Sequence, residues 1–454
     1  MSITNSAQNN SGATRALVDT VRGIRWSEMP DDAREVARHC LLDFLGTAIA
    51  GSREPLTEIL IREIVKSEVS AEAALIGRNE RASRLTAALV NGAAAHALDF
   101  DDTHMMMGGH PSVPVIPAVL ALAETEGAGG RAMLEAIVAG IELECRLGAM
   151  IGGQHYAVGF HSTGTLGTFG AAAACSHLLH LDENQWLCAM GLAGTQAAGL
   201  KSGFGTMAKP LHAGRAASSG LLSALLARGG FTANPEIIET AQGFAITHAG
   251  RASQKVLDQF AGRFLIRETL FKFHASCYLT HAPIEAAKQI RTENGLDTQT
   301  IDSVEVHVAP CALGVCNIQE PRTGLEGKFS LRSTTAMALS GIDTSSLETF
   351  TDARVTAADL VHLRDRVRVV GDEKLGSTQA TVFVESRGRR LHADADSGVP
   401  AANLSAQRES LITKFIAIAS PITGQKSAER VADAALHADE NMSASELMRL
   451  TRTL

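Results

Sequence analysis

The sequence lacks the features that mark several large classes of protein. It has no long basic run and a formal net charge of −8, which argues against nucleic acid or an anionic membrane as the main partner. Its longest runs of small apolar residues, such as 113–123 and 165–175, are shorter than the roughly 20 residues that a membrane-spanning helix needs. We therefore expect no nucleic-acid partner and no membrane partner.

Signatures of bound cofactors are also missing. The seven cysteines are scattered without a CxxC pair, and Cys311 and Cys316, the two closest, have no second pair to complete a zinc or iron–sulfur set. There is no Walker P-loop and no GxGxxG between a strand and a helix. The N-terminal residues 1–15 lack the apolar core of a signal peptide. These absences predict no cofactor, reduced thiols and a cytoplasmic protein.

Aromatic residues make up only 4% of the chain, whereas alanine is abundant and there are 41 glycines. Small side chains let helices approach closely, so from about residue 27 to 264 we expect a densely packed helical body. The segment 301–309 then alternates as a half-buried strand does, and 381–393 reads as a hairpin with a glycine-containing turn. The predicted fold is mainly α.

We expect a large all-helical domain with a smaller inserted α+β lid domain. The helical domain would be formed by residues 1–268 and 401–454, and the lid domain by residues 269–400.

The densest polar cluster is HALDFDDTHMMMGGHPS, residues 96–112. Asp99 and Thr103 are four residues apart and would share one face if this segment were helical. Glycines 108–109 predict a flexible turn that presents His110. The alternative is that the acids only cap helix ends. We expect Asp99, Thr103 and His110 to be the working residues. Asp101, Asp102 and His104 are expected to support them.

Metal binding by this cluster is chemically allowed. DDTHM resembles the start of a DDxxD magnesium motif, but Met105 stands where the last acid belongs. A zinc or iron site could be built from four side chains, without HExxH-type spacing to support it: His96, Asp99, His104 and His110. We expect no metal and keep a metal-dependent hydrolase as a remote alternative.

Later segments add further candidates. His161 begins a glycine-rich helix, whose positive end would keep the imidazole neutral and able to act as a base. Lys209 in MAKPLHAGRAA could hold a carboxylate or stabilise an enolate, and His212 begins the next small-residue helix. The segment FKFHASCYLTH, residues 271–281, lies near the expected domain junction, where ligand clefts are common. The alternatives are that His161 only caps its helix, that Lys209 and Lys272 are surface lysines, and that Cys277 is a core residue.

The order of these motifs resembles that of the MmgE/PrpD family, over most of the chain from Asp31 to Phe415. DFDDT, GGHPS, GFHSTGTLGTFGAAAA, TMAKPLHAGRAA and FK-x8-H occur here in the same order. The family includes 2-methylcitrate dehydratase, cis-aconitate decarboxylase and iminodisuccinate epimerase. The resemblance implies a helical domain with an α+β lid, a homodimer, and a metal-free site between the domains.

Motif matching implies a set of catalytic residues: Asp99, Thr103, His110, His161 and Lys209. Substrate contacts are expected from Lys272, Cys277, His281 and His212. This sequence departs from the decarboxylase-like members at Cys277, where they carry a histidine, and near Arg332-Ser333, where a tyrosine is replaced. Both departures count against decarboxylation.

All three family reactions build negative charge next to a carboxylate, which fixed donors stabilise. Lys209, Lys272 and His110 are candidates for holding carboxylates and this charge, with Asp99 or His161 as the base. We expect a hydro-lyase on a small hydroxy-di- or tricarboxylate such as 2-methylcitrate. An epimerase of a dicarboxylic amino-acid derivative comes second and a decarboxylase of the cis-aconitate type third. A non-catalytic helical protein is the alternative of another class.

Overall fold

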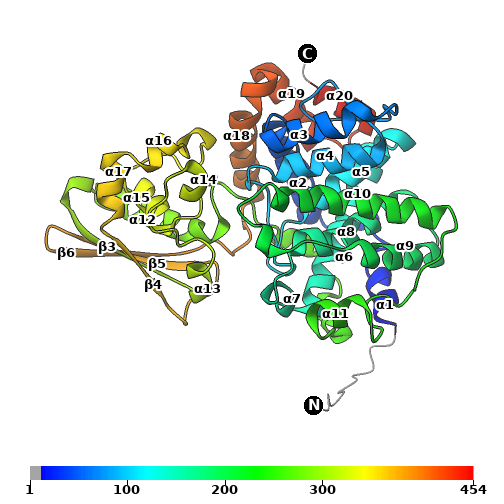
Figure 1. Cartoon of the computed structure of the whole chain (residues 1–454), viewed down its shortest axis with the longest axis horizontal. Helices are drawn as coiled ribbons and strands as arrows, with labels where there is room; N and C mark the ends of the chain where they lie inside the picture. Colours follow the sequence, from blue (N-terminus) through cyan, green and yellow to red (C-terminus); the bar gives the residue numbers. More distant parts are fainter. Residues whose placement is uncertain (1–11, 453–454) are drawn as a thin grey trace, which may run out of the picture. The chain divides into compact units, whose positions relative to one another are not determined.

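The computed structural model describes residues 12–452 and is mainly α-helical, which confirms the predicted fold class (Figure 1). The chain divides into two compact units. Unit 1 extends to Phe271 and resumes at Ala401, and unit 2 is Lys272–Pro400. The predicted domain boundary after residue 268 falls just before this division. Within residues 12–452, no helix is long and apolar enough to cross a bilayer.

Unit 1 is built from helices that pack on one another, with a two-stranded antiparallel hairpin, β1 (Ala73–Ala74) and β2 (Arg81–Ala82). Its N-terminal helices are α1 (Ala13–Asp19), α2 (Asp31–Gly51), α3 (Pro55–Glu63), α4 (Arg84–His96), α5 (Ser112–Glu126), α6 (Gly130–Ile151), α7 (Gln154–Ala157), α8 (Ser162–Leu178), α9 (Glu183–Gln196), α10 (Ala208–Arg228) and α11 (Phe244–Ala249). The C-terminal helices are α18 (Leu404–Thr423), α19 (Gln425–Leu436) and α20 (Ala444–Leu450).

Helix α8 lies at the centre of this unit and packs against α5, α6 and α10. All of its residues are buried, as expected for a helix without a polar face. A Cβ on Gly220 of α10 would lie 2.5 Å from the Ala171 Cβ of α8, and one on Gly214 would lie 2.1 Å from the Leu89 carbonyl oxygen of α4. The predicted close packing through small residues is confirmed.

The C-terminal segment completes unit 1, because α18 packs directly against α2. A Cβ on Gly46 would lie 2.8 Å from the Phe415 ring, so the two helices meet closely there. Next to this contact, the Lys414 ammonium lies 2.6 Å from the Asp43 carboxylate. The return of the chain therefore brings a buried cation into the N-terminal helices.

Unit 2 contains a four-stranded sheet with the order β4-β3-β5-β6. Its strands are β3 (Ile301–Val308), β4 (Val367–Gly371), β5 (Gln379–Ser386) and β6 (Arg389–Asp396). Strand β3 pairs parallel with β4 and antiparallel with β5, which pairs antiparallel with β6. Its helices are α12 (His281–Asn294), α13 (Pro310–Leu313), α14 (Gly324–Gly327), α15 (Leu331–Leu339), α16 (Asp352–Val355) and α17 (Ala358–Arg364).

The predicted strand and hairpin of unit 2 are confirmed. The turn between β5 and β6 has φ of 52° at Arg387 and 71° at Gly388, as a two-residue turn with twisted flanking strands requires. Ala380, Val382 and Val384 alternate as buried residues on β5. Helix α12 packs against β5, β6 and α15, and covers this apolar face.

Candidate active site

The polar cluster of residues 96–112 lies on a loop of unit 1 rather than on a helix. Helix α4 ends at His96 and α5 begins at Ser112. Asp99 has a φ of 52°, in the left-handed region that aspartate tolerates better than most residues but that no α-helix uses. The helical arrangement considered for Asp99 and Thr103 is therefore wrong. Strained backbone of this kind is common at functional sites.

Thr103 holds the loop in place through three hydrogen bonds. Its backbone exchanges two of them with Leu270, both of 2.8 Å. Its hydroxyl donates to the Gly109 carbonyl oxygen at 3.0 Å. Because that hydroxyl is already committed to the backbone, the geometry favours a positioning role for Thr103 over the catalytic role predicted for it.

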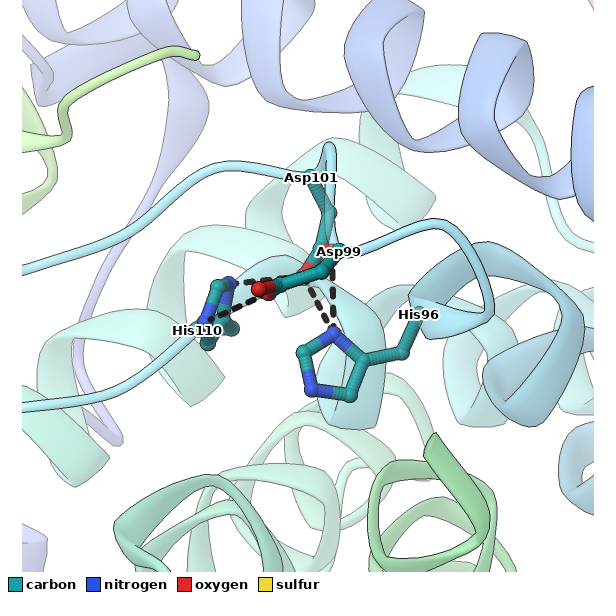
Figure 2. Close-up of side chains that lie close together, drawn as sticks. All are labelled: His96, Asp99, Asp101 and His110. Carbon is teal, nitrogen blue, oxygen red and sulfur yellow. Dashed lines mark hydrogen bonds and ion pairs between the residues drawn. The ribbon is translucent and has the colours of Figure 1, made fainter. Parts of the chain in front are cut away.

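Asp101 lies between two histidines (Figure 2). One carboxylate oxygen is 2.9 Å from His96 Nδ1 and the other is 2.9 Å from His110 Nδ1. Burial alone would raise the pKa of Asp101, but His110 and His96 hold it well below the usual range. An ionised Asp101 therefore fixes the orientation of both rings. Sequence reasoning gave this residue only a supporting role.

His96 is buried at the end of α4. Burial lowers its pKa to about 4, with Lys209 and His110 adding to the effect of burial and Asp101 opposing it. Its ring is therefore neutral near pH 7, with the proton on Nδ1 facing Asp101. The other nitrogen, Nε2, is a buried acceptor that has no hydrogen-bond partner within residues 12–452.

Lys209 brings α10 to the loop. Its ammonium lies 2.8 Å from Asp99 Oδ1, and both side chains remain partly exposed. The ammonium is also 5.3 Å from the centroid of the Phe204 ring. Lys209 lies in the first turn of α10, which begins at Ala208. The helix can contain Pro210 there, because the backbone N–H groups of a first turn have no helical partner. His110 Nε2 is 3.6 Å from the same Asp99 oxygen.

His161 precedes the first turn of α8 and joins the cluster through a ring contact with His96. Its ring stacks on His96 with the centroids 5.9 Å apart. Its Nδ1 lies 3.1 Å from Nδ1 of His212 on α10. Burial lowers the pKa of His161 well below the usual range, and His96, Lys209 and His110 add to this. The neutral imidazole that was predicted has burial, rather than the helix end, as its main cause.

The opposite face of the loop is anchored in the core. Asp102 accepts hydrogen bonds from the Ser112 hydroxyl at 2.5 Å and the Ser112 backbone N–H at 3.2 Å. Burial, with Asp43 adding to it, raises the pKa of Asp102 to about 8. Lys414 donates to Asp43 and, at 2.7 Å, to the carbonyl oxygen of Phe100. Neither Asp43 nor Lys414 was expected to matter, although a lysine within the apolar run of α18 was a usable signal.

The zinc set considered from the sequence does not form. His104 points away, with Nε2 2.8 Å from the Leu265 carbonyl oxygen. Asp101 takes its place beside His96, Asp99 and His110, with one ligand atom of each within 4.8 Å of the others. This second set also fits a metal poorly, because Asp101 already engages the Nδ1 atoms of both rings. A dication at Asp99 would also lie beside the Lys209 ammonium.

The candidates in unit 2 are all buried. Lys272 is 1% exposed, so it is no surface lysine. His281 begins α12, and its ring lies 5.0 Å from the ring of His274, which in turn contacts Glu285 at 2.6 Å. The thiol of Cys277 is hydrogen-bonded to that of Cys316, which helps to raise the pKa of Cys316. Cys277 therefore packs as a core residue within its own unit.

Two family models match this chain. The MmgE/PrpD N-terminal domain matches residues 15–256 and the MmgE/PrpD C-terminal domain matches residues 274–440. These two matches cover most of the chain, which therefore belongs to the MmgE/PrpD family.

Three curated relatives are cis-aconitate decarboxylases or resemble them. The cis-aconitate decarboxylase-like protein oryM of Aspergillus oryzae is 31% identical over 308 residues, or 64% of each chain. The cis-aconitate decarboxylase of Aspergillus terreus is 28% identical over 362 residues, or 74% of this chain and 73% of its own. The human enzyme is 30% identical over 295 residues, or 61% of this chain and 59% of its own. The match thus spans less than two thirds of the first and third relatives.

Proposed function

We propose that this protein is a lyase that acts on a small di- or tricarboxylate and stabilises negative charge that develops next to a carboxylate. The observation that carries the proposal is the position of the Lys209 ammonium, 2.8 Å from Asp99 and partly exposed, beside a cluster of neutral imidazoles. A cation at the edge of a buried polar cluster can bind a carboxylate. It can also stabilise an enolate-like anion more strongly than water does.

The residues of unit 1 divide naturally into roles. Lys209 would hold the reacting carboxylate, with Asp99 fixing its ammonium. His161 would carry the proton, because a neutral imidazole can accept a proton directly whereas a charged one cannot. Asp101 would keep His96 and His110 in fixed orientations and tautomers, as second partners of histidine commonly do.

Decarboxylation is the reaction named for the relatives. Their similarity to this chain leads us to propose decarboxylation ahead of dehydration and epimerisation, although the sequence analysis placed it third. In this reaction the C–C bond to one carboxylate breaks and its electron pair stays on carbon. A proton donor then completes the product. The site would need one anion holder and one donor, which Lys209 and an imidazole can supply.

Dehydration remains the second candidate, and His96 favours it. The buried Nε2 of His96 lacks a donor within residues 12–452, and unpaired buried acceptors are rare. A substrate hydroxyl is one group that could donate to it. In a dehydration the base removes the C–H proton, and a second group protonates the departing hydroxyl, so a hydroxy acid would need this additional contact.

A panel of di- and tricarboxylates incubated in D2O tests the proposal. Loss of CO2 or of water, read by mass spectrometry, identifies the reaction. Deuterium uptake without net conversion would instead point to the epimerase. If the purified protein converts and exchanges none of the panel, the proposal fails. Elemental analysis of the active protein checks the expectation of no metal, because stoichiometric zinc or iron would overturn it.

Three expectations complete the proposal. Unit 2 would act as the lid, with Lys272 and His281 supplying substrate contacts, and the protein would be a cytoplasmic homodimer. Light scattering of the purified protein measures the oligomeric state. A Lys272→Met variant that keeps the Michaelis constant of the intact protein would rule out the substrate contact from this lysine.

A further inference from the structure

Two histidines, His161 and His212, connect the candidate active site to a pocket of unit 1. The Nδ1 atoms of His161 and His212 are 3.1 Å apart, so one ring donates its N–H and the other accepts. His161 is 2% exposed and touches the rest of the cluster through His96. His212 is half-buried on α10, one turn after Lys209. The pair connects a buried ring to a partly exposed one.

His212 also lines a pocket of about 350 Å³ within unit 1. The loop before α10 packs closely on the His212 ring, since a Cβ on Gly199 would lie 3.3 Å from it. The polar lining of the pocket includes the side chains of Gln196, Ser202, Arg215 and Ser219, and small or apolar residues such as Leu200 form the rest. Water in this pocket can therefore reach His212 without passing the cluster.

We propose that His212 is a proton relay between His161 and this pocket, which deepens the proposed function and rests on it. A proton taken from the substrate binds His161 at Nε2. The Nδ1 proton of His161 passes to Nδ1 of His212, and the Nε2 proton of His212 passes to pocket water. The reverse order returns a proton to carbon. In this proposal His212 transfers protons to and from His161 and does not contact the substrate directly, as the sequence analysis had predicted it would.

The positive charges near His161 and His212 favour the neutral form of both rings. The groups that face His212 are His161 from α8 and Lys209 from its own helix, with Arg215 at the pocket. Burial and then Lys209 lower the pKa of His212. Neither ring therefore holds an additional proton for long near pH 7, so a proton that enters the pair is passed on.

Replacement of His212 by alanine, with imidazole added back, tests the relay. We expect turnover to fall by about 10²-fold, in the range of general acid–base catalysis, and to recover at least tenfold with imidazole, which the pocket can admit. His212→Asn keeps a hydrogen-bonding side chain but cannot pass a proton between two nitrogens. It should stay as slow as the alanine variant. Full activity of His212→Asn would show a merely structural role and overturn the relay.

A remote histidine provides the control. His437, exposed at the end of α19, should tolerate alanine without loss of turnover and without any response to imidazole. Rescue of both variants would mean that imidazole acts nonspecifically, and the relay would be rejected.

A second readout does not depend on turnover. In ¹⁵N-histidine-labelled protein, exchange of the His161 ring N–H with solvent should slow at least tenfold in His212→Asn. Unchanged exchange would overturn the relay. Slower exchange in a protein that converts no carboxylate would instead retain the relay and reject the proposed function. The two failures are thus distinguishable.

Discussion

The loop between α4 and α5 has two faces whose carboxylates behave in opposite ways. On the site face, Asp101 is ionised because the charges of His110 and His96 beside it outweigh its burial. On the core face, the adjacent Asp102 has a pKa of about 8, because burial and the nearby Asp43 outweigh its bonds to Ser112. Both side chains are fully buried. Burial alone therefore does not decide the charge of a carboxyl group, and the partners do.

This contrast separates the work of the two faces. The site face concentrates groups that can bind an anion and transfer a proton. The core face holds the loop in position, because Lys414 binds both Asp43 and the Phe100 carbonyl oxygen. Substitutions on the site face should therefore reduce turnover, and substitutions on the core face should change stability.

The largest effect is expected for Lys209→Met on the site face. Removal of a preorganised cation from a developing anion should lower turnover by about 10³-fold with little change in stability, since the side chain is partly exposed. Steady-state kinetics on the substrate found in the panel measures the loss. Lys255→Met, at an exposed position of the same unit, should keep normal turnover. Equal turnover of the two variants would show that Lys209 has no role in the reaction.

Lys414→Met should have the next largest effect, on stability. It leaves the Asp43 carboxyl buried without its cation, and breaking a buried pair in this way costs about 3 kcal/mol. Urea unfolding measures the change. Combining it with Asp43→Leu should recover most of the stability, because the remaining acid is removed. A double variant no more stable than the single one would show that the pair does not hold the loop.

Asp101→Asn should lower turnover by about 10²-fold, because an amide offers the two imidazoles one acceptor oxygen instead of two and carries no negative charge. Its pKa in the folded protein is depressed, so the stability that it contributes is present above pH about 4 and is lost as the pH falls through the folded pKa. The variant should lack this acid-dependent loss in urea unfolding across pH. An unchanged rate with unchanged pH dependence would falsify the role of Asp101.

Asp102→Asn should have the smallest effect at about pH 4, where an amide replaces a protonated carboxyl of the same shape. The folded pKa of Asp102 is raised, so the stability that this group contributes is greatest below the ordinary pKa of aspartate and is lost as the pH rises toward about 8. The variant should therefore gain stability relative to the intact protein between these limits, with nearly normal turnover. A constant difference across this range would contradict the protonated state of Asp102.

Much of the fold was predictable because it depends on short patterns. The small residues of α8 and α10 predicted close helix packing, and Gly214 and Gly220 confirm it. Alternation in residues 301–309 and the glycine turn after β5 predicted three strands of the sheet, β3, β5 and β6, whereas β4 was missed. The lid role of unit 2, the homodimer and the roles of the site residues stay predictions.

The candidate site was predictable only in part. Asp99, His110, His161 and Lys209 were proposed from separate motifs, and in unit 1 they lie together. The position of Asp101 between two histidines was missed, because DFDDT offers three acids and no local pattern ranks them. The His161–His212 contact joins helices α8 and α10, so no motif contained it.

The sequence by itself determined the helical class, strands β3, β5 and β6 and the family, because these follow from composition, periodicity and ordered motifs. Tertiary structure decided which groups are charged and which are bound. Asp101 and Asp102 are identical neighbours in the chain, yet one meets His96 and His110 while the other meets Ser112 near Asp43. A pKa depends on the groups that surround it in space, and here the fold of one loop turns neighbouring carboxyl groups toward different partners, with Asp43 added from α2.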